Sequence, residues 1–105
     1  MKIYNKLIRD RIPEIIEASG KTCSIRTLGS EEYLNELNRK LTEELKEYQE
    51  SGELEELADL VEIVYAIAEF KGSSIEEFER IRQDKREKRG GFEKRLFLES
   101  IHGNY

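Results

Sequence analysis

The sequence is poor in the residues that stabilise small secreted proteins and in those that interrupt helices. It has 105 residues, with one cysteine (Cys23), one proline (Pro13) and no tryptophan. A lone cysteine excludes an internal disulfide and predicts a reducing, cytoplasmic environment. A single proline leaves long stretches free to form helices, because proline is the residue that helix interiors tolerate least.

Long apolar runs and familiar phosphate-binding loops are also missing. No run approaches the roughly 20 apolar residues that cross a bilayer, so no membrane association is expected. The start, Met1 to Asp10, is too charged for the apolar part of a signal peptide. The sequence contains neither a P-loop nor a GxGxxG motif. Because no repeat or low-complexity segment divides the chain, residues 1–105 are predicted to form one domain.

Positive charge is missing from the centre of the chain. Residues 53–70 hold six acidic residues and no Lys or Arg, whereas residues 80–95 hold eight basic residues against three acidic ones. The N-terminal segment is basic as well, with Lys6 and Arg9 among its cations. The net charge of −5 argues against nucleic acid as a partner. The chain therefore has an acidic centre between two basic ends.

Hydrophobic spacing predicts an all-α protein. One amphipathic helix is expected from Ser30, as its N-cap, to about Glu50. A second is expected from Glu53 to Lys71, with apolar residues over more than half of its circumference. A short chain has little surface with which to cover such an apolar helix. We therefore predict that the helix is central and that it forms a subunit interface.

Shorter elements are expected around these two helices. A short helix should begin near Pro13 and end at Gly20. Residues 22–28 alternate β-branched with polar side chains and predict an extended segment. A third long helix should begin at Ser74, which forms a capping box with Glu77, and end at the Gly90-Gly91 pair. Residues 92–98 resemble a short strand that could pair with the N-terminal segment, which would bring both basic ends together.

Four carboxylates stand in two pairs on either side of Gly52. Glu44 and Glu47 precede the glycine, and Glu56 and Asp59 follow it, so each pair lies on one helix face. If the two helices fold back at Gly52, residues equally far from the turn lie at the same depth. Glu47 then faces Glu56. Glu44 faces Asp59 in a second layer about 4.5 Å away. Carboxylates gathered like this repel unless a cation lies among them, and oxygen ligands suit Mg²⁺ or Mn²⁺.

Simpler explanations exist for both charged clusters. The acids could form a solvated helix face, and on the first helix Lys40 and Lys46 can pair with them. The second helix contains no basic residue that could do the same. Some of the basic residues at 85–89 complement a helix dipole, and the surplus suits a polyphosphate. A nucleic-acid patch is disfavoured by the net charge and by the lack of interleaved aromatic residues.

Together, acids for a metal and bases for phosphates predict metal-dependent hydrolysis of a phosphoanhydride. A bound metal would neutralise phosphate oxygens and lower the pKa of a coordinated water. A nearby carboxylate would orient that water or accept its proton. Lys and Arg side chains would stabilise the charge on a pyrophosphate leaving group.

The chain resembles the MazG-like members of the all-α nucleoside triphosphate pyrophosphohydrolase superfamily. The resemblance lies in EExxE at residues 43–47 and ExxD at residues 56–59. The opening YNKLIRDRIP at 4–13 and the sequence KREKRGGF at 85–92 are similar to short, stand-alone members. This resemblance implies a helical bundle that forms a homodimer or homotetramer. It also implies Mg²⁺-dependent cleavage of a nucleoside triphosphate between its α- and β-phosphates.

The resemblance also implies roles for single residues. The expected metal ligands are Glu44, Glu47, Glu56 and Asp59. The expected catalytic acids are Glu43, Glu44 and Glu47. The basic ends supply the expected substrate contacts, which are Lys6, Arg9, Lys85 and Arg89. Nucleotide-pool clean-up is the expected role. The alternatives are phosphoribosyl-ATP pyrophosphohydrolase activity and a non-catalytic helical module that binds a nucleotide or a protein.

Overall fold

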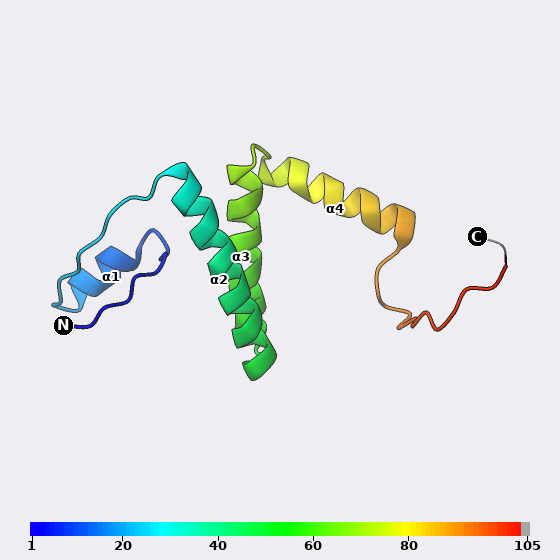
Figure 1. Ribbon diagram of the computed structural model, residues 1–105, viewed down its shortest axis with the longest axis horizontal. Coiled ribbons are helices and arrows are strands. Elements are labelled where there is room, and N and C mark those ends of the chain that lie inside the picture. Colours follow the sequence, from blue (N-terminus) through cyan, green and yellow to red (C-terminus); the bar gives the residue numbers. More distant parts are fainter. Residues whose placement is uncertain (104–105) are drawn as a thin grey trace.

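The computed structural model describes residues 1–103, and their regular structure is entirely α-helical. In chain order the helices are α1 (Ile12–Ala18), α2 (Ser30–Ser51), α3 (Leu54–Phe70) and α4 (Ile75–Arg89) (Figure 1). None of residues 1–103 lies in a strand. The predicted all-α class is thus confirmed. Among these helices, none combines the length and the apolar character needed to cross a membrane.

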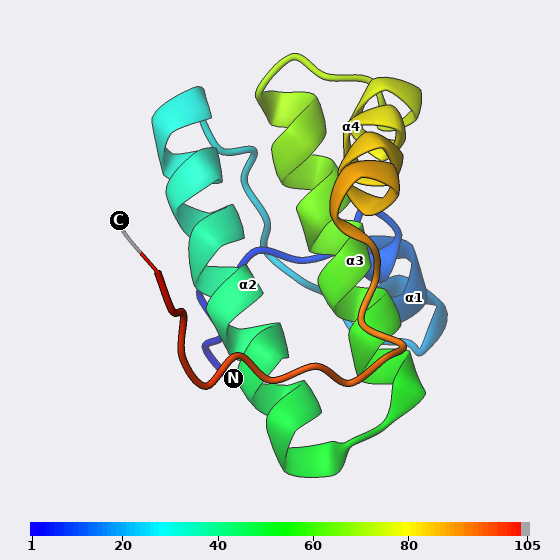
Figure 2. The ribbon, with the colours of Figure 1, turned by 90° about the vertical axis from the view of Figure 1, so that its right-hand side faces the viewer.

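Helices α2 and α3 form an antiparallel hairpin at the centre of the molecule. Gly52 ends α2 with a φ of 68°, in the left-handed region that glycine adopts without steric cost. Its N–H donates to the carbonyl oxygen of Tyr48 at 2.7 Å. The two helices then run side by side (Figure 2). Far from the turn, the rings of Tyr33 and Phe70 meet edge to face at 5.7 Å. The predicted turn at Gly52 is therefore confirmed.

Ser74 is the N-cap of α4, because the backbone N–H of Glu77 donates to its hydroxyl at 3.1 Å, which is one of the two bonds of the predicted capping box. Tyr65 of α3 fixes the first turns of α4. Its hydroxyl donates to Glu79 at 2.8 Å, and its ring meets the Phe78 ring edge to face at 6.1 Å. Beyond these contacts α4 projects away from the hairpin and carries the C-terminal tail with it (Figure 1).

The single chain buries little apolar surface. The buried hydrophobic residues among those described are Leu37, Ile63 and Ala68. The accessible surface is 9824 Å², whereas a compact monomer of 12.4 kDa exposes roughly 6,100 Å². The radius of gyration is 18.9 Å, compared with roughly 13 Å for a compact domain of this length. An isolated chain of this shape lacks the core that normally stabilises a domain.

Two local predictions, the N-cap at Ser30 and the pairing of the tail, are wrong. Ser30 is not an N-cap but the first helical residue, because the carbonyl of Gly29 already accepts the first helical hydrogen bond, from Tyr33 at 2.9 Å. Residues 22–28, which are expected to be extended, lie in no helix and no strand. The tail at 92–98 does not pair with the N-terminal segment, because α4 carries it to the opposite side of the hairpin (Figure 1).

Candidate metal centre

Three carboxylates from the two helices of the hairpin meet on the half that contains the turn. Oxygen atoms of Glu44 on α2 and of Glu56 and Asp59 on α3 all lie within 4.8 Å of one another. We call these three residues the acid cluster. The hairpin assembles the acid cluster because Gly52 reverses the chain, so that residues at similar distances from the turn come to the same depth. The sequence predicted this convergence.

Glu44 is the buried member of the acid cluster, with 8% of its surface exposed. Its Oε1 lies 3.7 Å from Nζ of Lys40, one helical turn earlier. Its Oε2 is inaccessible to solvent and has no hydrogen-bond partner among the described residues. Buried carboxylate oxygens are nearly always paired, because an unpaired one has lost its hydration without compensation. The position of Glu44 Oε2 therefore indicates a ligand, and the neighbouring oxygens indicate a cation.

The electrostatics of the acid cluster also favour a cation. The pKa of Glu44 is raised, first by burial and then by the neighbouring Glu47 carboxylate, while the charge of Lys40 opposes the shift. The pKa of Glu56 is raised too, by desolvation and then by the charges of Glu47 and Asp59. Both shifts arise because negative charges are crowded together with too little positive charge, which favours the protonated forms. A divalent ion would remove this repulsion.

Glu47 and Glu43 lie outside the acid cluster. Both side chains are exposed, and neither belongs to the group whose oxygens converge. The charge of Glu47 nevertheless acts on both Glu44 and Glu56, which places Glu47 next to the cluster. Of the four predicted metal ligands, the structure thus brings three together and leaves Glu47 beside them. The oxygen donors suit Mg²⁺ or Mn²⁺, with coordination positions left for water or phosphate.

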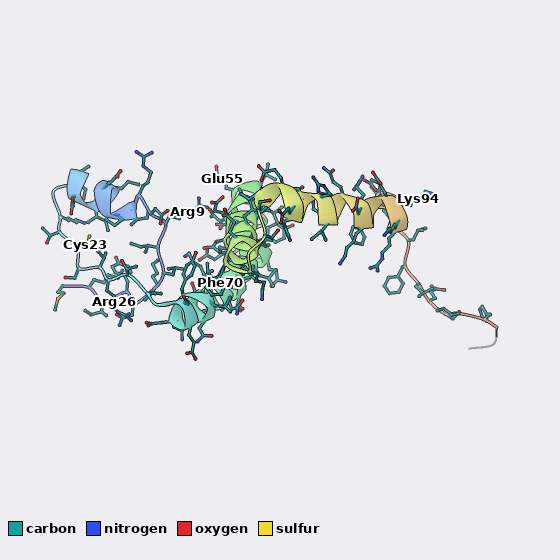
Figure 3. All side chains as sticks on the ribbon, turned by 90° about the horizontal axis from the view of Figure 1, so that it is seen from above. Arg9, Cys23, Arg26, Glu55, Phe70 and Lys94 are labelled. Atoms are coloured by element: carbon teal, nitrogen blue, oxygen red, sulfur yellow. The ribbon has the colours of Figure 1, made fainter. Side chains whose placement is uncertain are left out.

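Arg9 reaches the edge of the acid cluster from the N-terminal segment. Its Nη2 lies 2.6 Å from Oδ1 of Asp59, although 50 residues separate them in sequence. In Figure 3 the Arg9 label lies between α1 and the hairpin. Lys6, expected in the same role, instead places its Nζ 5.4 Å from the centre of the Tyr4 ring. No pattern in the sequence predicts the pairing of Arg9 with Asp59.

Lys85 and Arg89 lie on α4, away from the acid cluster of their own chain. Phe70 follows Glu56 by 14 residues, which is about 21 Å along α3. Helix α4 begins beyond Phe70 and leads away from the hairpin (Figure 1). A surface hollow on α4 contains no residue of the acid cluster; its lining residues are Arg82, Gln83, Arg86 and Glu87. Within one chain, the structure does not bring the basic end and the acid cluster together.

Comparison with known proteins gives one partial match to report. A protein of Mycolicibacterium smegmatis (strain ATCC 700084 / mc(2)155), described as an uncharacterized protein, is 57% identical over 42 residues. The match covers 40% of this chain and 43% of that protein, so the chain spans less than half of its relative. No protein-family profile and no solved structure matches the chain.

Metal binding should weaken as the pH falls. Since the pKa values of Glu44 and Glu56 are raised, both glutamates take up protons above their ordinary range, and each bound proton competes with the cation. Calorimetric titration with Mn²⁺ between pH 7.5 and 4.5 should show the affinity falling by up to about 100-fold per pH unit once both glutamates titrate. Titration at pH 6 in two buffers of different ionisation enthalpy should reveal proton release on binding. An affinity that is constant over this pH range would contradict the assignment.

Proposed function

We propose that the protein is a MazG-like nucleoside triphosphate pyrophosphohydrolase that uses Mg²⁺, or Mn²⁺ in its place, to form a nucleoside monophosphate and pyrophosphate. The observation that carries the proposal is the acid cluster around the unpartnered, buried Oε2 of Glu44. The residues that form this cluster belong to the two acidic motifs in which the sequence resembles that superfamily. A protein of this kind would remove unwanted nucleotides from the cellular pool.

The residues around the acid cluster have separate chemical tasks in such a reaction. When bound, a divalent cation would neutralise phosphate oxygens and lower the pKa of a coordinated water. Glu44, Glu56 and Asp59 would hold the cation. Glu47, which is exposed beside them, is suited to orient the attacking water and to accept its proton. Glu43, which is exposed outside the acid cluster, would be a supporting acid.

A second copy of the chain is part of the proposal. The chain exposes about 3,700 Å² more than a compact monomer of its mass, and a standard interface needs only about 800 Å² from each partner. Large apolar side chains are exposed along the hairpin, α4 and the tail; examples are Leu54, Val61, Ile81, Phe92 and Leu96. Burying them against a second copy in a homodimer or homotetramer would supply the missing core.

Charge supports the same partner. The basic end of α4 lies away from the hairpin of its own chain, and the hairpin carries a net negative charge (Figure 1). Pairing two copies would let the basic end of each α4 face an acidic hairpin, which favours association. Lys85 and Arg89 would then contact substrate phosphates bound at the partner's acid cluster. The predicted substrate contacts at these positions remain a proposal that depends on this assembly.

Pyrophosphate release is the direct test of the proposed function. With Mg²⁺, the pure protein should release pyrophosphate from at least one member of a panel of ribo- and deoxyribonucleoside triphosphates and phosphoribosyl-ATP. Glu56→Gln should reduce kcat/KM by at least about 100-fold, because even residues behind a metal ligand contribute 10- to 100-fold. Glu55→Gln is the matched control, since Glu55 is exposed and outside the acid cluster.

Two results would contradict the hydrolase assignment. The first is no pyrophosphate release from any substrate in the panel. The second is equal activity in the Glu56→Gln variant and the wild type. The first result would favour a non-catalytic helical module, and the second would show that the release of pyrophosphate does not depend on the acid cluster. Circular dichroism and size-exclusion chromatography of both variants would verify that fold and assembly are unchanged.

A further inference from the structure

The Arg9–Asp59 pair links two parts of the molecule that otherwise have few contacts. Helix α1 packs against none of the other three helices. Among the described residues, two ion pairs join the segment 1–28 to the hairpin. One joins Arg26 to Glu32 at the start of α2, with distances of 2.6 and 2.9 Å. The other is Arg9–Asp59, at 2.6 Å. Arg9 thus fastens the N-terminal segment to the acid cluster itself.

The Arg9 guanidinium pairs with one of the three carboxylates that a metal ion would use. Oδ1 of Asp59 accepts its hydrogen bond, so in this arrangement that oxygen is shared with a cation the chain provides. The pair is well exposed to solvent, with 54% of the Arg9 side chain and 42% of the Asp59 side chain accessible. Ion pairs this exposed contribute little to stability. A divalent cation held by three carboxylates can therefore displace the guanidinium.

We propose that Arg9 is the counter-ion of Asp59 in the metal-free protein. A divalent cation displaces Arg9 from Asp59, and Arg9 then binds the phosphates of the incoming nucleotide. The inference rests on the proposed function, because it assigns Arg9 a place in the same site. Displacement leaves the guanidinium next to the acid cluster, where a metal-bound polyphosphate would lie. Arginine suits that second role because its planar fork donates two parallel hydrogen bonds to phosphate oxygens. The Arg9 side chain thereby neutralises the site when no metal is bound, and contacts the substrate when metal and nucleotide are bound.

The exchange also predicts that the N-terminal segment responds to the site. When Arg9 leaves Asp59, the segment keeps only the Arg26–Glu32 pair as an ionic link to the hairpin. Binding of phosphate by Arg9 fastens the segment again, this time through the substrate. The chemical class of ligand that this arrangement recognises is a metal-bound polyphosphate, and a metal ion alone would not re-anchor the segment.

Titration of Mn²⁺ without nucleotide tests the counter-ion role. Arg9→Gln should bind Mn²⁺ more tightly by roughly two- to fivefold, the size expected from losing one exposed competing ion pair. Arg11→Gln is the matched control, because Arg11 pairs with Glu14 inside the N-terminal segment and not with the acid cluster. Its Mn²⁺ affinity should equal that of the wild type. Unchanged or weaker Mn²⁺ binding by Arg9→Gln would overturn the counter-ion role.

Titration of the Mn²⁺-loaded protein with a non-hydrolysable nucleoside triphosphate tests the second role. Arg9→Gln should weaken nucleotide binding about tenfold or more, since charge-assisted hydrogen bonds are lost. Arg9→Lys should restore the wild-type Mn²⁺ affinity but only part of the nucleotide affinity, because lysine lacks the fork. Full nucleotide affinity in Arg9→Gln would overturn the transfer to phosphate. Both titrations measure binding, so a failure to hydrolyse any nucleotide would leave their outcome readable.

Discussion

Glu44→Gln should make the metal-free protein more stable and abolish its proposed activity. Glu44 is buried and its Oε2 has no hydrogen-bond partner within residues 1–103, so its negative charge destabilises the folded state. Glutamine has the same shape without the charge, and its amide can donate to a neighbouring carboxylate. The gain should be on the order of 1 kcal/mol, which raises Tm by about 4 to 8 °C in a chain of this size. A residue that lowers stability but is needed for function fits a binding site.

The pH dependence of this gain has a definite sign. Because the folded-state pKa of Glu44 is raised, the folded protein binds a proton there more tightly than the unfolded chain does. This contribution to stability is therefore greatest at low pH and is lost as the pH rises through the raised pKa. Glu44→Gln lacks the titrating group. The stability difference between variant and wild type should thus be largest at neutral pH and shrink on acidification.

A bound metal should reverse the order of stability. Mn²⁺ stabilises the form that binds it, so saturating Mn²⁺ should raise the wild-type Tm and leave Glu44→Gln nearly unchanged. Thermal unfolding followed by circular dichroism, with EDTA or with Mn²⁺ and at one protein concentration, measures both effects. Glu43→Gln is the control for stability, because its exposed side chain should change the free energy of unfolding by less than about 0.5 kcal/mol. A destabilised Glu44→Gln in EDTA would show that Oε2 has a partner after all.

The acid cluster could be predicted from the sequence because it depends on local rules. Gly52 is the residue that the left-handed turn requires, and the spacing of Glu44, Glu56 and Asp59 fixes their depth in the hairpin. Glu47 stands outside the cluster because equal depth does not determine rotation about the helix axis. Turn symmetry specifies how far a residue lies from the turn, whereas convergence of its oxygens depends on how two helices pack.

Contacts that depend on irregular backbone could not be predicted in the same way. Arg9 meets Asp59 across 50 residues because a segment without regular structure follows a particular path. No periodicity describes such a path. The apolar alternation in the tail predicts a strand, yet Phe92 and Leu96 are 96% and 85% exposed. An apolar pattern predicts burial but does not say whether the covering surface belongs to the same chain.

Val61→Asp should dissociate the proposed assembly and unfold much of the chain. Val61 lies on α3 with 44% of its surface exposed, beside an apolar hollow at the junction with α4. In an isolated chain an aspartate here would remain hydrated and cause modest harm. At an interface it would be a buried, unpaired charge, which destabilises by several kcal/mol. Because the single chain buries few hydrophobic residues, loss of the partner should also remove cooperative unfolding.

Light scattering after size-exclusion chromatography distinguishes these cases. The wild type should elute as a dimer or tetramer, with a Tm that rises with protein concentration, because association stabilises the fold. Val61→Asp should elute as a monomer and lose pyrophosphate release, since Lys85 and Arg89 would no longer reach an acid cluster. Glu62→Ala is the neighbouring control, because its exposed side chain should leave the assembly intact. Leu54→Asp provides a second variant. An aspartate in the first turn of α3 stabilises the helix itself, so any loss of assembly in this variant would come from the interface. A wild type that is monomeric and unfolds cooperatively would refute the assembly, and with it the supply of phosphate-binding cations from a partner.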